Sequence, residues 1–238
     1  YIVNEYCLYN FCISILKKMN RTLNAYKEWA KTYDVHPNPH TLVEHSDFIK
    51  LTDPRKNEFI LDAACGTGKY TKEFHKAGAK VIGLDFCKEM LEIAKEKIPE
   101  VHFVNHNLNK KFPFKASNFD KITCGQTIKH IKYLNPVFAE FYRILKKGGK
   151  LIFSVTHPEI NFEGFAMRFR PKFRLAQVSD IFHHKYADYF DAFENSGFRI
   201  DKIKQVPVNS SIKHLLTDKS YKLLKGRYEV VIFRLIKP

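Results

Sequence analysis

The stretch that decides the fold is Phe59-Ile-Leu-Asp-Ala-Ala-Cys-Gly-Thr-Gly-Lys69, which continues to Val81-Ile-Gly-Leu-Asp85. It begins with a short apolar run, the pattern of a parallel strand that is covered on both faces. Gly66 and Gly68 then allow a sharp turn and a close approach of the backbone to a ligand. The stretch predicts a strand, a glycine turn, a helix whose N-terminus faces the turn, and a second strand that ends in a carboxylate.

Three kinds of nucleotide site use a glycine turn of this sort. A P-loop needs glycine at position 63 and Ser or Thr at position 70, but the chain has Ala63 and Tyr70. A dinucleotide fingerprint that starts at Gly66 needs a third small residue at position 71, which is Thr71. Asp85 follows where doubly wound folds place the carboxylate that holds a ribose. These features indicate a ligand with a ribose and an amino-acid tail.

The segment Leu-Asp-Ala-Ala-Cys-Gly-Thr-Gly, residues 61–68, resembles the first motif of the class I S-adenosylmethionine-dependent methyltransferases. Segments similar to this family continue over residues 25–155. Two positions depart from the family pattern. Ala64 stands where many members have glycine, and Asn107 stands where an aspartate usually accepts the adenine amino group. An amide oxygen can accept the same hydrogen bond without the charge.

The resemblance implies that S-adenosyl-L-methionine is the cofactor, and its site is expected beyond the carboxyl ends of the strands. The residues that it assigns to cofactor binding are Asp62, Ala64, Gly66, Thr67, Gly68, Asp85, Phe86, Asn107, Leu108 and Gln126.

The predicted fold is a Rossmann-like, doubly wound α/β domain with a seven-stranded sheet. The strands are expected at residues 59–61, 81–85, 101–104, 121–124, 151–155, 198–206 and 228–236. The sheet is expected to be mostly parallel, and the resemblance implies that its last strand is antiparallel. Helices are predicted at 22–33, 42–50, 69–77, 87–97 and 135–146, and another ends at Ser196.

Residues 1–18 are interpreted as an N-terminal extension without a structural role, and residues 19–238 as a single methyltransferase domain. Helices near the start of this domain are expected to cover the cofactor, as they do in the family. Residues 157–185 are predicted to form a lid over the mouth of the site, because ligands of such sheets bind beyond the carboxyl ends of the strands. Residues 159–179 of this segment carry four phenylalanines together with Arg168, Arg170 and Arg174.

Composition narrows the class of protein. A hydrophobic content of 45% in 238 residues allows a full core. Five cysteines without a CxxC pair favour reduced thiols and a cytoplasmic location, and no run of 18 apolar residues predicts a membrane span. The net charge of +15 suits an anionic partner such as RNA, an acidic carrier protein or a membrane surface, but a plain lysine-rich surface is the favoured explanation because the lysines are spread along the whole chain.

Transfer of the methyl group from S-adenosylmethionine needs an aligned acceptor, a site that excludes water and, for many acceptors, a base. His157 is the first candidate for that base, because it directly follows the fifth strand. His184, with its neighbour His183, comes second, and Tyr26 third. His130 is assigned a packing role by the resemblance. Paired histidines at 36 and 40 or at 183 and 184 lack further ligands at metal-binding spacing, so no metal is predicted.

The predicted function is methyl transfer to a small molecule, with an aromatic or anionic acceptor suggested by the composition of the lid. Methylation of RNA or of an acidic carrier protein is the alternative. A third hypothesis is a protein that binds S-adenosylmethionine without catalysis. The tracts typical of DNA methyltransferases are absent, since Cys124-Gly125-Gln126 replaces Pro-Pro-aromatic and Thr123 precedes the cysteine.

Overall fold

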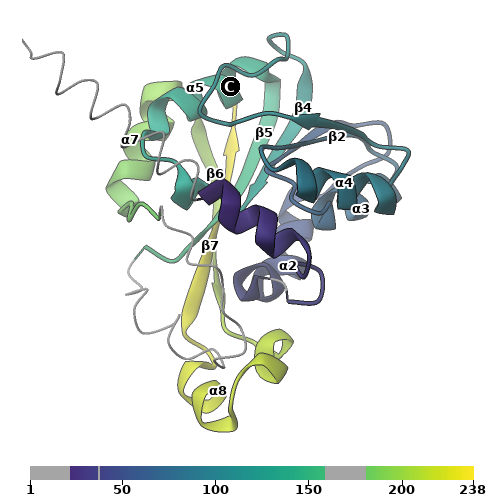
Figure 1. Ribbon diagram of the computed structural model, residues 1–238. Helices are drawn as coiled ribbons and strands as arrows, with labels where there is room; N and C mark the ends of the chain where they lie inside the picture. The colour runs from purple at the N-terminus through teal and green to yellow at the C-terminus, as the bar shows by residue number, and fades with distance from the viewer. Residues whose placement is uncertain (1–21, 37, 159–180) are drawn as a thin grey trace, which may run out of the picture.

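The computed structural model describes residues 22–36, 38–158 and 181–238, and its centre is one seven-stranded sheet (Figure 1). The strand order is β3-β2-β1-β4-β5-β7-β6. Strands β1 to β5 run parallel, and β7 is antiparallel to both of its neighbours. The bounds are β1 (Phe59–Ala63), β2 (Lys80–Asp85), β3 (His102–Asn105), β4 (Phe119–Gly125), β5 (Leu145–Thr156), β6 (Arg199–Pro207) and β7 (Tyr228–Ile236). The predicted fold class, including the antiparallel last strand, is confirmed.

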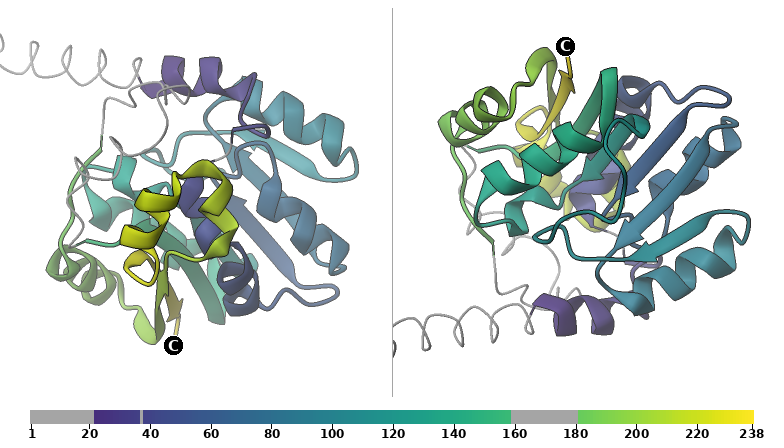
Figure 2. Two further views of the ribbon diagram at one scale, coloured as in Figure 1. Left: turned by 90° about the horizontal axis from the view of Figure 1, so that it is seen from below. Right: turned by 90° about the horizontal axis from the view of Figure 1, so that it is seen from above.

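Helices cover both faces of this sheet (Figures 1 and 2). One face is covered by α5 (Leu134–Ile144) and α7 (Tyr186–Ser196), and the other by α2 (Pro39–Thr52), α3 (Lys69–Lys76) and α4 (Lys88–Lys97). Consecutive strand residues divide between the two cores, as Ile152 and Phe153 show, because strand side chains alternate. Among the described residues, no helix is both long and apolar enough to cross a membrane.

Several element boundaries differ from the sequence-based expectation. The first described helix covers residues 22–30, and α2 begins at Pro39, where Asn38 Oδ1 accepts a hydrogen bond from the His40 amide at 3.0 Å. This Asn cap followed by proline is a strong start signal that the prediction of 42–50 missed. Helix α5 ends at Ile144, and Gly148 lies inside β5, which begins earlier than predicted.

Residues between β6 and β7 were left without a prediction. They form the short 3₁₀ helix η2 (Ser210–Leu215) and helix α8 (Asp218–Leu224). Another 3₁₀ turn, η1 (Ile128–His130), follows β4. The predicted N-terminal extension and most of the predicted lid, including its arginines, lie outside the described residues.

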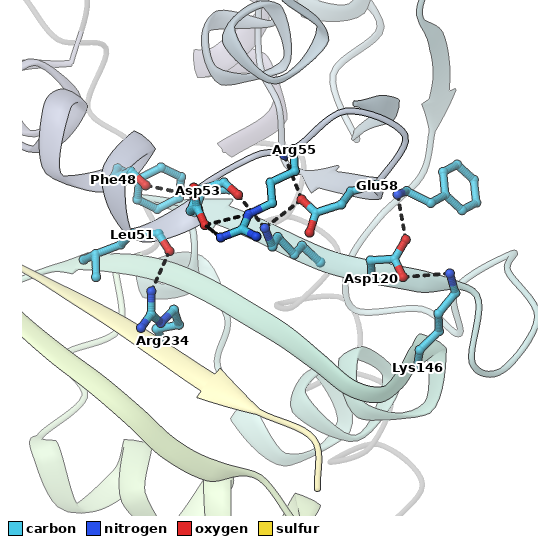
Figure 3. Close-up of polar contacts among 11 residues, drawn as sticks. Phe48, Leu51, Asp53, Arg55, Glu58, Asp120, Lys146 and Arg234 are labelled. Atoms are coloured by element: carbon cyan, nitrogen blue, oxygen red, sulfur yellow. Dashed lines mark hydrogen bonds and ion pairs between the residues drawn. The ribbon is translucent and has the colours of Figure 1, made fainter. Parts of the chain in front are cut away.

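A polar network closes the amino-terminal edge of the parallel strands (Figure 3). Lys121 Nζ donates to Glu58 Oε2 at 2.7 Å, and the Lys121 side chain is only 7% exposed. Asp120 accepts from the amide of Phe59 at 2.8 Å and from Lys146 Nζ at 2.7 Å. These contacts join the starts of β1, β4 and β5, so the amino-terminal edge is fixed and the carboxyl edge is left for the site.

Candidate functional site

A cavity of about 740 Å³ lies at the carboxyl ends of β1, β2 and β4. Its walls come from the segment of residues 22–41, the glycine turn, the turns after β2 and β3, and the segment after β4. This is the edge where doubly wound sheets bind ligands. The predicted residues that line it are Tyr26, Ala64, Gly66, Asp85, Phe86, Asn107, Leu108 and Gln126.

The glycine turn and Asp85 form one unit at the floor of this cavity. Gly66 has a φ of +56°, and a Cβ added there would meet nothing within 4 Å. Its amide donates to Asp85 Oδ2 at 2.9 Å, and the amide of Cys87 donates to Oδ1 at 2.9 Å. Burial raises the pKa of Asp85 to about 6 in spite of these two bonds. Each carboxylate oxygen keeps a further lone pair for a ligand hydroxyl.

Three other predicted cofactor residues support the turn from behind and are not among the described residues that line the cavity. Asp62 is 1% exposed and accepts from Thr71 Oγ1 at 2.6 Å and from Thr123 Oγ1 at 2.9 Å. Burial raises its pKa to about 6. Thr71 is the residue that departs from the dinucleotide fingerprint, and its hydrogen bond to Asp62 connects α3 to β1.

Thr67 and Gly68 complete this support. Thr67 Oγ1 donates to Asp34 Oδ1 at 2.8 Å, which holds the N-terminal segment against the turn. Gly68 has a φ of +81°, and a Cβ there would lie 3.0 Å from Ile98 Cδ1 and 3.3 Å from Ala94 Cβ. The second glycine thus lets the turn before α3 approach α4 closely, whereas the first leaves open space around its Cα.

A buried polar cluster that the sequence analysis missed lies beside the turn. Glu44 of α2 is fully buried and accepts from Tyr70, Gln126 and Ser154 at 2.8 to 2.9 Å. Burial raises the pKa of Glu44. Gln126 has a φ of +54°, so its backbone is held in the left-handed region by these contacts. No spacing within the sequence signals the cluster, because its members come from four separate elements.

Asn107 and Leu108 lie in the cavity wall after β3. Asn107 Oδ1 accepts from the amide of Asn109 at 2.9 Å. The same oxygen also accepts from Nδ2 of Asn109 at 3.2 Å. An adenine amino group would therefore have to replace this longer bond in order to donate to Asn107 Oδ1.

The cavity wall also contains apolar side chains and a hydrogen-bonded pair of polar side chains. Leu23, Ile131, Tyr133 and Phe182 contribute to it. Tyr26 Oη lies 3.2 Å from Nε2 of His130, and both residues line the cavity. Burial raises the pKa of Tyr26, and the neighbouring Tyr33 and Asp85 add to the effect. His130, which was expected only to pack, thus lies in the cavity wall beside the third-ranked catalytic candidate.

The two higher-ranked histidines lie elsewhere. His157 is 6% exposed, and its Nε2 is 3.2 Å from Tyr186 Oη, while its amide donates to the carbonyl of Glu229. Nε2 of His184 lies 2.7 Å from the carbonyl oxygen of Ile131. Neither residue, nor His183, is among the described residues that line the cavity. Within the described ranges, no three His, Cys, Asp or Glu side chains are grouped as ligands for a metal ion.

Comparison with known proteins places the glycine turn and the strands around it in one family. A family profile described as a methyltransferase domain matches residues 61–153. The demethylmenaquinone methyltransferase of Oceanobacillus iheyensis is 28% identical over 184 residues, which cover 72% of this chain and 77% of that protein. The enzyme of the same name from Shouchella clausii is 27% identical over 86% of this chain and 92% of that protein.

Solved structures share the fold. An S-adenosylmethionine-dependent methyltransferase from Mesorhizobium loti is 20% identical, with a TM-score of 0.67 over 82% of this chain and 97% of that chain. Phosphoethanolamine N-methyltransferase 2 from Haemonchus contortus, solved with S-adenosyl-L-methionine, is 17% identical, with a TM-score of 0.63 over 90% of this chain and 60% of that chain. At these identities the likeness supports the fold alone.

Proposed function

Because the chain belongs to the class I S-adenosylmethionine-dependent methyltransferases, we propose that it methylates a small acceptor with an apolar ring, held beside Tyr26 in the cavity. The observation that carries this proposal is the mixed lining of one cavity, in which Asp85 is accompanied by the apolar side chains of Leu23, Ile131 and Phe182. The relatives named demethylmenaquinone methyltransferases support it, since their name specifies a small quinone as acceptor.

The residues around Asp85 fit S-adenosyl-L-methionine. Asp85 would accept hydrogen bonds from the ribose hydroxyls, and the open space over Gly66 would admit the methionyl tail against the backbone. Phe86, Asn107 and Leu108 would hold the adenine ring. The cofactor supplies a methyl group that is already activated on a sulfonium, so the protein must chiefly align the acceptor and exclude water.

Tyr26 and His130 would remove a proton from the acceptor. The raised pKa of Tyr26 makes a free tyrosinate unfavourable, so Tyr26 alone is a poor base. A concerted transfer avoids this charge: Tyr26 takes the acceptor's proton while its own proton passes to Nε2 of His130, which lies 3.2 Å away. The proton then rests on the imidazole, and the acceptor oxygen or its conjugated ring carbon is left electron-rich for the methyl group.

The decisive experiment incubates the purified protein with radiolabelled S-adenosylmethionine and three acceptor pools: a lipid-soluble metabolite extract, total RNA and total protein. We expect label in a small molecule of the extract. Label in RNA or in an acidic carrier protein alone would overturn the choice of acceptor. No label in any pool would support the non-catalytic hypothesis. A cytoplasmic location belongs to the same proposal and is checked by cell fractionation.

The base is tested by three variants with the identified acceptor. Tyr26→Phe and His130→Asn should each lower kcat by roughly 10²-fold or more, while affinity for S-adenosylhomocysteine stays unchanged, because a base acts only in the transition state. His157→Asn tests the competing hypothesis. Loss of kcat in His157→Asn, with full activity in the other two variants, would move the base to His157.

A further inference from the structure

The β6–β7 projection, residues 208–227, extends past the end of the sheet (Figures 1 and 2). Its base is set by the pairing of Pro207 with Tyr228, just beyond the pairing of Thr156 with Val230 at the carboxyl end of β5. The projection therefore leaves the sheet at the same edge as the cavity, which opens at the carboxyl ends of β1, β2 and β4. It consists of η2, α8 and their connections.

The projection is packed firmly onto the domain. Ile212, Leu215, Leu216 and Leu224 are buried in the same core as α2 and the inner residues of β7. Asn209 Nδ2 also donates to the carbonyl of Val43 in α2 at 3.0 Å. Because its apolar side is fully used by this packing, the outward side is presented in one fixed orientation.

That outward side is strongly basic and carries apolar side chains. The exposed cations of the projection are Lys213, Lys219, Lys222, Lys225 and Arg227, against one exposed carboxylate, Asp218. None of these cations forms a salt bridge with another residue in the described part of the chain. Leu223 is 48% exposed and Tyr228, at the base of the projection, is 52% exposed.

The geometry points to a peripheral membrane site: we propose that the β6–β7 projection docks on a membrane surface rich in anionic phospholipid. Lysines attract anionic headgroups, and an exposed leucine and tyrosine can enter the boundary between headgroups and acyl chains. Lys219, Lys222 and Leu223 are spaced to share one face of α8, so the charges and the leucine can act together.

An aliphatic tip distinguishes lipid from nucleic acid as the partner. Proteins that bind single-stranded nucleic acid combine cations with aromatic rings on which bases stack. The exposed ring of Tyr228 could stack on a base, but the exposed Leu223 offers no ring. Burial of Leu223 in a bilayer removes apolar surface from water, which binding to a nucleic acid would not require. Docking would also turn the cavity edge toward the membrane, so a lipid-soluble acceptor could enter the cavity from the bilayer. Only this route for the acceptor rests on the proposed function.

The test is co-sedimentation of the full chain with vesicles of phosphatidylcholine, with and without about 30% phosphatidylserine. The triple variant Lys219→Gln, Lys222→Gln, Lys225→Gln should bind anionic vesicles about 100-fold more weakly. A matched triple, Lys56→Gln, Lys80→Gln, Lys147→Gln, changes net charge equally at exposed sites of the opposite edge and should bind as the native chain does. Leu223→Asn should weaken binding about fivefold at constant charge.

Binding that requires phosphatidylserine, falls with salt and is lost only in the first triple and in Leu223→Asn supports the proposal. If both triple variants lost vesicle binding equally, net charge alone would explain the binding, and the proposal would be overturned. Failure of the native chain to bind anionic vesicles would overturn it as well. A short single-stranded RNA that binds through the same lysines, with an affinity that Leu223→Asn does not change, would identify nucleic acid as the partner instead. None of these outcomes depends on methyl transfer, so they leave the proposed reaction untouched.

Discussion

Asp85 combines a ligand-facing carboxylate with a pKa that burial raises to about 6. The ionised form is the better acceptor for ribose hydroxyls, so affinity should be full above this pKa and be lost as the pH falls through it. Calorimetry should show S-adenosylhomocysteine binding at least about tenfold more weakly at pH 5 than at pH 8.

The control for this pH dependence is Asp85→Asn, which should bind S-adenosylhomocysteine weakly and with nearly the same affinity at pH 5 and pH 8. Asp62 also has a pKa raised to about 6, but it is present in both proteins, so the difference between them isolates Asp85. A pH dependence that persists in Asp85→Asn would show that another group controls binding.

Asn107 tests the adenine contact. Its Oδ1 already accepts from the amide of Asn109, and a carboxylate at this position would accept the same bond. Asn107→Asp should therefore keep or improve cofactor affinity. Asn107→Leu should lose about 1 kcal/mol of binding, roughly fivefold. Equal affinities for all three proteins in calorimetry would show that the residue does not contact the adenine.

Ala64 holds a φ of +59°, in the left-handed region that disfavours side chains. Many family members have glycine here, and the structure gives the reason. Ala64→Gly should stabilise the protein by about 0.5–1 kcal/mol, because relief of strain exceeds the extra entropy of the unfolded glycine. Urea denaturation provides the measurement. The neighbouring buried strand residue, changed as Ala63→Gly, should destabilise instead, and a loss of stability in both variants would contradict the strain argument.

At the scale of elements, the close approach of the glycine turn to α4 depends on Gly68. A Cβ at this position would add an overlap with Ile98 and Ala94 to the strain of a φ of +81°. Gly68→Ala should lower the free energy of unfolding by about 2–4 kcal/mol. The matched control is Gly148→Ala, which has a φ of +74° and open space around its Cβ, so it should lose only about 1–2 kcal/mol. Equal losses in urea denaturation would mean that the contact of the turn with α4 contributes nothing.

At the scale of the whole molecule, the cavity is shared by segments far apart in the sequence, from residue 22 to residue 182. A ligand that binds only the folded state stabilises it by about 2.7 kcal/mol at a concentration of 100 Kd. Tm should then rise by about 5–10 °C with S-adenosylhomocysteine in a thermal scan. Asp85→Ala at the same ligand concentration should show a much smaller rise. An unchanged Tm in the native chain would argue against cofactor binding in this cavity.

Local sequence was sufficient for the strand, turn and helix around Gly66 and for the position of Asp85. Apolar runs, glycines and helix caps act over a few residues, so their outcome does not depend on the rest of the chain. The antiparallel last strand of a mostly parallel sheet and the cofactor followed from the resemblance of residues 25–155 to a family, and the fold and the comparisons confirm both. The order of the strands was decided by the tertiary structure. The individual roles of the site residues, the domain boundary at residue 19 and the lid at 157–185 stay predictions.

Tertiary structure alone decided which distant side chains meet. Tyr26 and His130 are 104 residues apart and approach because the N-terminal helix and the turn after β4 lie over the same strand ends. Glu44, Gln126 and Ser154 meet in the same way, through the packing of α2 on the sheet. His157 follows β5 at the expected edge, yet its ring packs against Tyr186 of α7. Periodicity determines which face of an element is buried, but only the layering of helices on the sheet determines which side chains face one another there.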